Sequence, residues 1–265
     1  MKLKGFVKGA LVLIFFNLIG KIVGAIYRIP LANLLGPVGI GEYQLVFPLY
    51  SLLLAISISG VPVAISRIVA EYNSKGQFGD AKRLLRLAIV YLFAVSLVGT
   101  GLIVVCAKFI AKIQGNPEIY LCYYGIAPSI LFVGILSVFR GYFQGNLNMM
   151  PTALSNLIEQ VGKLAFGLIF STRLIKFGVV YGVLGALLGI SVSEFLALVF
   201  LSCYYLFYAR KHKQTSLMVL TKRQISKQLI MTSLPITFGG IAGPITAIID
   251  SLLVVNLLMF TGFSS

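Results

Sequence analysis

The sequence is poor in charged residues, and poorest in acidic ones. Of its 265 residues only 11% are charged, seven residues are acidic, and 58% are hydrophobic. A soluble domain carries about 25% charged residues, so this composition excludes an ordinary soluble protein. Apolar runs of about eighteen residues or more, enough to cross a bilayer, recur along the chain. The roughly ten-residue alternating segments of a membrane β-barrel are missing. We therefore predict an all-α polytopic membrane protein.

Side chains that commonly carry out chemistry are also scarce. The one histidine, His212, lies between two lysines, and the seven acidic residues are scattered. A membrane-embedded transferase needs His, Asp or Glu clustered at the membrane edge, so we predict that the protein is not an enzyme. The three cysteines are an odd number without a spacing motif, which argues against a disulfide framework or a metal site. No cofactor and no metal are expected.

The net charge of +15 fits a membrane topology better than a nucleic-acid partner, because no loop is long enough to fold into a basic surface. We predict about seven spans, at residues 10–30, 44–70, 84–107, 119–142, 152–172, 179–208 and 230–260. Alternate loops then carry fourteen Lys and Arg residues on one side and four on the other. The positive-inside rule places the richer side, and the N-terminus, in the cytoplasm. The basic then apolar start lacks an A-x-A-like cleavage site, so we expect a retained first helix in the cytoplasmic membrane, surrounded by membrane lipids.

The first predicted span contains two cations, Lys21 and Arg28. They are seven residues apart, so they fall within roughly 20° of each other on one helix face, together with Asn17 and Gly24. A cation at bilayer depth is unfavourable and must face a partner or a watery cavity. No acidic residue lies on the same predicted helix, so an anion is expected from elsewhere. Pro30 is predicted to bend or end this helix.

Three acidic residues and a lysine inside the later predicted spans are further candidates for a site. Glu159 and Lys163 are four residues apart and can pair on one helix face, either as an internal ion pair or as part of a cavity lining. Glu194 stands alone in its span, as a protonated group, a paired group or a site for a coupling ion. Asp250 is the one acid of the last predicted span. We regard Glu194 and Asp250 as candidates for coupling to a proton or a sodium ion.

Glycine and proline mark places where the helices are expected to break or to pack closely. The phrase SGVP at residues 59–62 predicts a kink within the second span. The spacing of Gly178, Gly182, Gly185 and Gly189 predicts close packing of the sixth span against a neighbour. The last span contains several helix breakers between Pro235 and Pro244, and broken spans are typical of transporter sites.

Four phrases resemble a known family: RIPLANLLGPVGIGEYQLVFPLY at 28–50, SGVPVAISRIVAEYNSKG at 59–76, FRGYFQGNLNMMPTALSNLIEQVGK at 139–163 and LPITFGGIAGPITAIIDSLLV at 234–254. In these phrases the chain resembles the multidrug/oligosaccharidyl-lipid/polysaccharide flippase superfamily. Within it, the likeness is to stage V sporulation protein B-like and lipid II flippase-like polysaccharide biosynthesis proteins, over their N-terminal half.

The resemblance implies a two-lobed transporter with six helices in each lobe. Residues 1–208 are then expected to form the N-terminal six-helix lobe, 209–229 a basic cytoplasmic connector, and 230–265 the first helix of an incomplete second lobe. A separate chain is a candidate to supply the missing lobe.

The function that the resemblance implies is translocation of a polyprenyl-pyrophosphate-linked saccharide, such as lipid II or a related cell-wall, spore-cortex or polysaccharide precursor. Transport would proceed by alternating access. Lys21 and Arg28 match the first-helix cations that hold the lipid pyrophosphate in this family, while Asn17, Glu159 and Lys163 are candidate lining residues. The alternatives are a cation-coupled multidrug exporter of the same fold, and a truncated product that does not transport.

Overall fold

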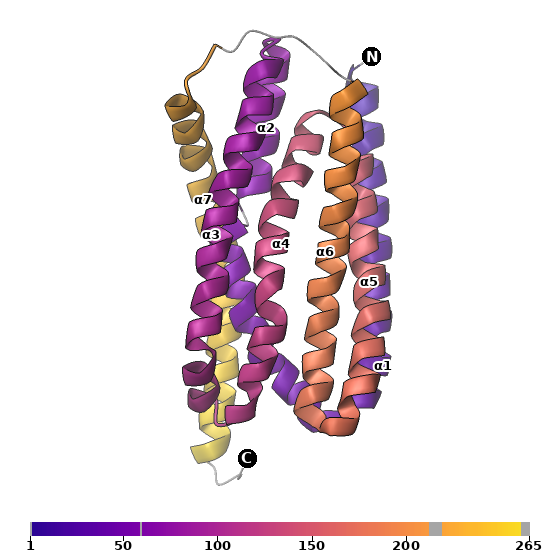
Figure 1. The fold of residues 1–265 in the computed structure, drawn as a ribbon, viewed down its shortest axis with the longest axis vertical. Coiled ribbons are helices and arrows are strands. Elements are labelled where there is room, and N and C mark those ends of the chain that lie inside the picture. Colours follow the sequence, from indigo (N-terminus) through magenta and orange to yellow (C-terminus); the bar gives the residue numbers. More distant parts are fainter. Residues whose placement is uncertain (1, 59, 212–218, 261–265) are drawn as a thin grey trace.

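The computed structural model describes residues 2–58, 60–211 and 219–260, and the described chain is helical with no strand. The long helices are α1 (Lys2–Ile58), α2 (Val61–Ser74), α3 (Phe78–Ile113), α4 (Tyr120–Gly145), α5 (Met150–Leu174), α6 (Val179–Lys211) and α7 (Lys222–Phe260), with short 3-10 turns η1 (Pro117–Ile119) and η2 (Ile175–Phe177). They form an elongated bundle with α5 and α6 beside the first part of α1 (Figure 1). The predicted all-α fold is confirmed.

Five stretches of the described chain are long and apolar enough to cross a membrane: Leu11–Ser74, Phe78–Ile113, Pro117–Gly145, Met150–Phe177 and Val179–Arg210. The first of them is not one straight rod. It runs down the bundle, turns near the end opposite the N-terminus, and returns to the end where α2 lies (Figure 1). This stretch therefore supplies two antiparallel passes, in agreement with the two spans predicted there.

The turn between those passes occurs at Gly36. The helix continues through Pro30, which corrects the prediction only in that Pro30 does not end it. Gly36 has φ 67° and ψ −177°, in a region of backbone space that is essentially restricted to glycine. One residue is enough to reverse the chain, and Pro37 begins the next helical part, where its missing N–H would have no partner anyway. We call residues 2–35 the first arm of α1 and residues 37–58 its second arm.

The predicted kink in the second pass is confirmed as a break between α1 and α2. Gly60 precedes α2, and Pro62 occupies its first turn. A Cβ atom added to Gly60 would lie 2.5 Å from Thr237 Oγ1 and 2.7 Å from Thr237 N, so α7 packs directly on this break. Helix α7 begins at Lys222, inside the segment expected to be a connector.

The start of α7 is tied to the turn between α2 and α3. The Asp80 carboxylate is fully buried and accepts hydrogen bonds from the backbone N–H groups of Val219, at 3.0 Å, and Leu220, at 3.4 Å. Arg83 Nη1 donates to the Leu220 carbonyl at 2.8 Å. Because these groups are partly or fully removed from water, the tie fixes the backbone that leads into α7.

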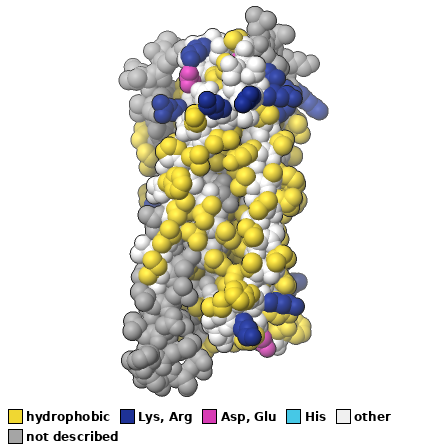
Figure 2. All heavy atoms as spheres, turned by 90° about the vertical axis from the view of Figure 1, so that its left-hand side faces the viewer, with side chains coloured by type: hydrophobic (Ala, Val, Ile, Leu, Met, Phe, Trp, Pro, Cys, Tyr) yellow, Lys and Arg dark blue, Asp and Glu magenta, His cyan; other side chains and the backbone are white. Residues whose placement is uncertain are grey.

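Two clusters of buried apolar side chains stabilise opposite halves of the bundle. Along α6 one cluster ends at Ile190 and the other begins at Ala197, and Glu194 lies between them. Figure 2 shows one side of the bundle, with hydrophobic side chains over its middle and Lys and Arg side chains gathered at the end that carries the α2–α3 turn. An apolar belt between charged ends is the pattern of a protein that spans a bilayer.

Candidate functional site

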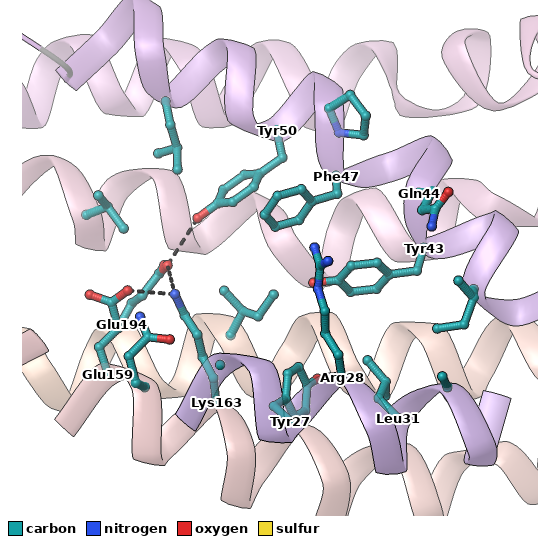
Figure 3. Close-up of a pocket in the computed structure, with 18 of the residues that line it drawn as sticks. Tyr27, Arg28, Leu31, Tyr43, Gln44, Phe47, Tyr50, Glu159, Lys163 and Glu194 are labelled. Atoms are coloured by element: carbon teal, nitrogen blue, oxygen red, sulfur yellow. Dashed lines mark hydrogen bonds and ion pairs between the residues drawn. The ribbon is translucent and has the colours of Figure 1, made fainter. Parts of the chain in front are cut away.

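A cavity of about 1010 Å³ opens between the two arms of α1 and helices α4, α5 and α6. Its charged lining residues are Arg28, Arg140, Glu159, Lys163 and Glu194, and its aromatic ones are Tyr27, Tyr43, Phe47 and Tyr50. Figure 3 shows the two arms of α1 facing each other across this space, with Arg28 on one arm and the aromatic side chains of Tyr43, Phe47 and Tyr50 on the other. The Gly36 reversal is what brings them together.

Glu159 on α5 holds two cations at once. Its Oε1 lies 2.6 Å from Lys163 Nζ on the same helix, and its Oε2 lies 2.8 Å from Arg140 Nη2 on α4. Arg140 is anchored further by a 3.0 Å hydrogen bond from its Nε to Ser155 Oγ. The predicted pairing of Glu159 with Lys163 is therefore present. Both residues also line the cavity, so they form an internal ion pair and part of the cavity lining at the same time.

Glu194 on α6 lies beside a cation and a hydroxyl group. Its Oε1 lies 3.7 Å from Lys163 Nζ and accepts a 3.1 Å hydrogen bond from the Tyr50 hydroxyl (Figure 3). Its side chain is only 2% exposed. The other oxygen, Oε2, is buried and makes no hydrogen bond with the described residues. A buried carboxylate oxygen without a partner is unfavourable and suits a site that takes up a cation.

Arg28 is the cavity cation that has no counter-ion among the described residues. It comes from the first arm of α1, is exposed, and extends toward Tyr43 on the second arm (Figure 3). Within the described residues, the four ion pairs join Glu71, Glu159 and Glu194 to other cations, and none involves Arg28. The lining thus holds three cations and two carboxylates, and the excess positive charge belongs to Arg28.

The other predicted site residues lie elsewhere. Lys21 is exposed but is not among the cavity-lining residues, because two helical turns separate it from Arg28 by roughly 10 Å along the axis. Asn17 lies still further along that arm, where its Oδ1 accepts a 2.8 Å hydrogen bond from Asn156 Nδ2 on α5. Asp250 belongs to α7, and its side chain is outside the described residues.

Sequence reasoning missed Arg140 and the aromatic lining residues of this site, Tyr27, Tyr43, Phe47 and Tyr50. Arg140 lies near the end of the span predicted at residues 119–142, and it reaches Glu159 from α4. Tyr50 gave no signal, since tyrosines are common in membrane spans. A search for basic residues near the ends of apolar runs would have found Arg140, but its partner depends on how α4 and α5 pack.

The fold and the site together define a multi-pass membrane protein with a charged cavity enclosed by its helices. The family of polysaccharide biosynthesis proteins matches residues 6–260. The chain belongs to this family. The resemblance stated from the sequence is thereby confirmed.

Curated relatives from Bacillus subtilis (strain 168) agree with this assignment. Stage V sporulation protein B is 29% identical over 98% of this chain and 51% of its own length. The lipid II flippase MurJ is 27% identical over 92% of this chain and 48% of its own length. The chain spans about half the length of the curated relatives it matches.

Solved structures of membrane transporters share the fold. A MATE protein in complex with MaD3S superposes with a TM-score of 0.73 at 17% identity, over 88% of this chain and 53% of that one. A MOP superfamily transporter from Pyrococcus furiosus, described as having a binding pocket of reversed polarity, gives 0.73 at 17% identity, over 89% of this chain and 52% of that one. At these identities the likeness establishes the fold alone.

Proposed function

We propose that this chain forms a substrate-binding lobe of a membrane transporter that moves a polyprenyl-pyrophosphate-linked saccharide across the cytoplasmic membrane by alternating access. Lipid II, or a related cell-wall, spore-cortex or polysaccharide precursor, is the proposed substrate class. The family assignment and the name of the MurJ relative support this class. The proposal is one of transport and not of catalysis, and the other half of the transporter would come from further sequence or a separate chain.

The observation that carries the proposal is Arg28, which lines the cavity and has no carboxylate partner among the described residues. A pyrophosphate does not enter hydrocarbon unaided, because stripping water from its charges costs tens of kcal/mol in the Born limit. A guanidinium in a watery cavity offsets part of that cost, since it can donate two parallel hydrogen bonds to phosphate oxygens. The polyprenyl tail can stay in lipid while the headgroup occupies the cavity.

Binding of inorganic pyrophosphate to the purified chain tests the proposal. In nanodiscs of phosphatidylcholine, which carry no net lipid charge, we expect Arg28→Ala to weaken binding at least about tenfold, because hydrogen bonds to charged groups contribute about 1.5–3 kcal/mol each. Arg28→Lys should fall between wild type and Ala, since it keeps the charge but loses the paired donors.

The matched control is Arg67→Gln, which removes an exposed arginine of α2 that is not among the cavity-lining residues. This variant should bind as wild type does. Equal binding by Arg28→Ala and wild type would remove the basis of the proposal.

A cation-coupled drug exporter of the same fold is the second candidate. Glu159, Glu194 and the aromatic wall of Tyr43, Phe47 and Tyr50 favour it, because carboxylates and aromatic faces attract lipophilic cations. Both carboxylates, however, are already paired with protein cations. Tetraphenylphosphonium distinguishes the two candidates: saturable binding of this cation without binding of pyrophosphate would favour the exporter.

For ion coupling we propose Glu194, because it combines deep burial with an oxygen that has no hydrogen bond among the described residues. A proton or a sodium ion bound there would neutralise one of the two carboxylates in the cavity. The cavity would then carry more net positive charge and hold an anion more tightly. The N-terminus is proposed to face the cytoplasm, because Lys and Arg gather at its end of the bundle (Figures 1 and 2).

A further inference from the structure

Lys163 occupies an unusual position in the cavity, because it lies between two carboxylates at different distances. Its Nζ is 2.6 Å from Glu159 Oε1 and 3.7 Å from Glu194 Oε1. Its side chain is 21% exposed, whereas those of the two acids are 12% and 2% exposed. An ammonium group has three donors on a flexible stem, so Lys163 can redirect itself toward the cavity without any movement of the helices.

Lys163 can leave Glu159 only if another cation stays paired with the Glu159 carboxylate. A buried carboxylate that loses its only cation is strongly unfavourable, and this normally locks such a pair. Here Arg140 Nη2 lies 2.8 Å from the second oxygen of Glu159, and Arg140 Nε donates a hydrogen bond to Ser155 Oγ that also holds the guanidinium in place. Glu159 therefore stays paired with Arg140 when Lys163 departs.

We propose that Lys163 is a switching cation that moves from Glu159 to the anionic headgroup when the substrate enters, and that Arg140 is the positioning residue that makes this exchange possible. The inference rests on the proposed function and deepens it. In the empty cavity Glu159 shares its charge between two cations. In the occupied cavity Arg140 alone neutralises Glu159, and Lys163 joins Arg28 on the phosphate oxygens.

The alternative is a static network that only stabilises the bundle. The switch and the static network predict different pyrophosphate binding when Arg140 is neutralised alone and when Arg140 and Glu159 are neutralised together. In Arg140→Gln, Glu159 has Lys163 as its sole cation and holds it. In the double variant Arg140→Gln/Glu159→Gln, both members of the buried Arg140–Glu159 pair are neutral, and Lys163 keeps only its longer, 3.7 Å contact with Glu194.

The test is titration of purified chain in phosphatidylcholine nanodiscs with inorganic pyrophosphate. We expect Arg140→Gln to weaken binding about tenfold, and the double variant to restore binding to the wild-type level or above it. Lys163→Met should weaken binding about as much as Arg140→Gln does. Arg67→Gln, outside the cavity, serves as the control for loss of a positive charge.

Failure of the double variant to restore binding would overturn the exchange, because it would show that Arg140 contacts the anion directly or only supports the fold. Unchanged binding in Arg140→Gln would overturn it as well. Helical circular dichroism and a single symmetrical elution peak establish that each variant is folded. If wild type does not bind pyrophosphate, or binds it independently of Arg28, the proposed function itself fails. If binding depends on Arg28 but not on Arg140 and Glu159, only the switch fails.

Discussion

At the scale of single residues, the cavity shows which electrostatic relations can be predicted from a sequence. The pairing of Glu159 with Lys163 was predictable, since residues four apart share one helix face, and the 2.6 Å contact confirms it. The contact between Arg140 and Glu159 was not, because it depends on the rotation of α4 against α5. Lys21 and Arg28 belong to one helical arm, but helical rise carries Lys21 beyond the cavity lining.

Glu194 gives the first prediction at this scale. Its neighbours in the structure are Lys163 and the Tyr50 hydroxyl, and its second oxygen makes no hydrogen bond with the described residues. If Glu194 takes up the coupling ion, pyrophosphate binding to wild type should tighten with added sodium or with acid. Glu194→Gln imitates the neutralised group, so its binding should be tight and should respond to neither.

The same titrations, run over a series of sodium concentrations and pH values, measure this response. Glu118→Gln, an exposed acid outside the cavity, is the control and should respond as wild type does. A Glu194→Gln protein that keeps the full dependence on sodium and acid would assign the coupling ion to another group.

At the scale of elements, the reversal of α1 at Gly36 and the close packing of α5 on α6 position the cavity. The glycine spacing of α6 predicted that packing: a Cβ on Gly185 would lie 2.6 Å from the backbone of Phe170 on α5. The exact place of the α1 reversal was missed. Proline at position 30 is a strong helix-breaking signal, but the helix continues through it, and the left-handed backbone at Gly36 depends on the packing of both arms.

Gly36→Ala is the test of this reversal. A side chain at φ 67° and ψ −177° is strained whatever space surrounds it, and such conformations cost about 1–3 kcal/mol. We expect the free energy of unfolding to fall by about this amount, measured by SDS titration of the purified chain in mixed micelles. Pyrophosphate binding should weaken with it, because the two arms face each other across the cavity.

Gly41→Ala is the matched control for this measurement. Gly41 is helical and has open space around it, as Gly36 does, but its φ is not positive. Alanine is favoured over glycine in a helix, so this variant should be as stable as wild type or slightly more stable. Equal stability of both variants would show that the reversal does not depend on glycine.

At the scale of the whole molecule, composition predicted the class of protein. A chain with 58% hydrophobic and only 11% charged residues does not have the composition of a soluble domain. The order of the helices followed from the apolar runs and turn residues. The cavity did not follow, since it is made by five helical passes whose contacts join residues far apart in the chain. The chain spans about half of its curated relatives, and a cavity enclosed by one such half already carries charge in excess.

Orientation in the membrane is the prediction at this scale. Residues 71–86, which include the α2–α3 turn, contain four Lys and Arg residues, so we expect this turn to face the cytoplasm and the turn around Glu118 to face outward. In a protein whose three cysteines are replaced, Lys75→Cys should resist a membrane-impermeant maleimide in intact cells, and Glu118→Cys should react with it. The reverse labelling pattern would invert the topology.

The tie between Asp80, Arg83 and the backbone before α7 has a mechanical consequence. Tyr72 on α2 adds to it by donating a 2.7 Å hydrogen bond to Gln228, two turns into α7. The first turns of α7 are thus held to the α2–α3 end of the bundle and are unsuited to act as a hinge. Further along, residues 235–244 contain two prolines and three glycines, which give a helix its weakest resistance to bending. Any bending of α7 would therefore occur within the helix, at a hinge in residues 235–244, next to the Gly60 break.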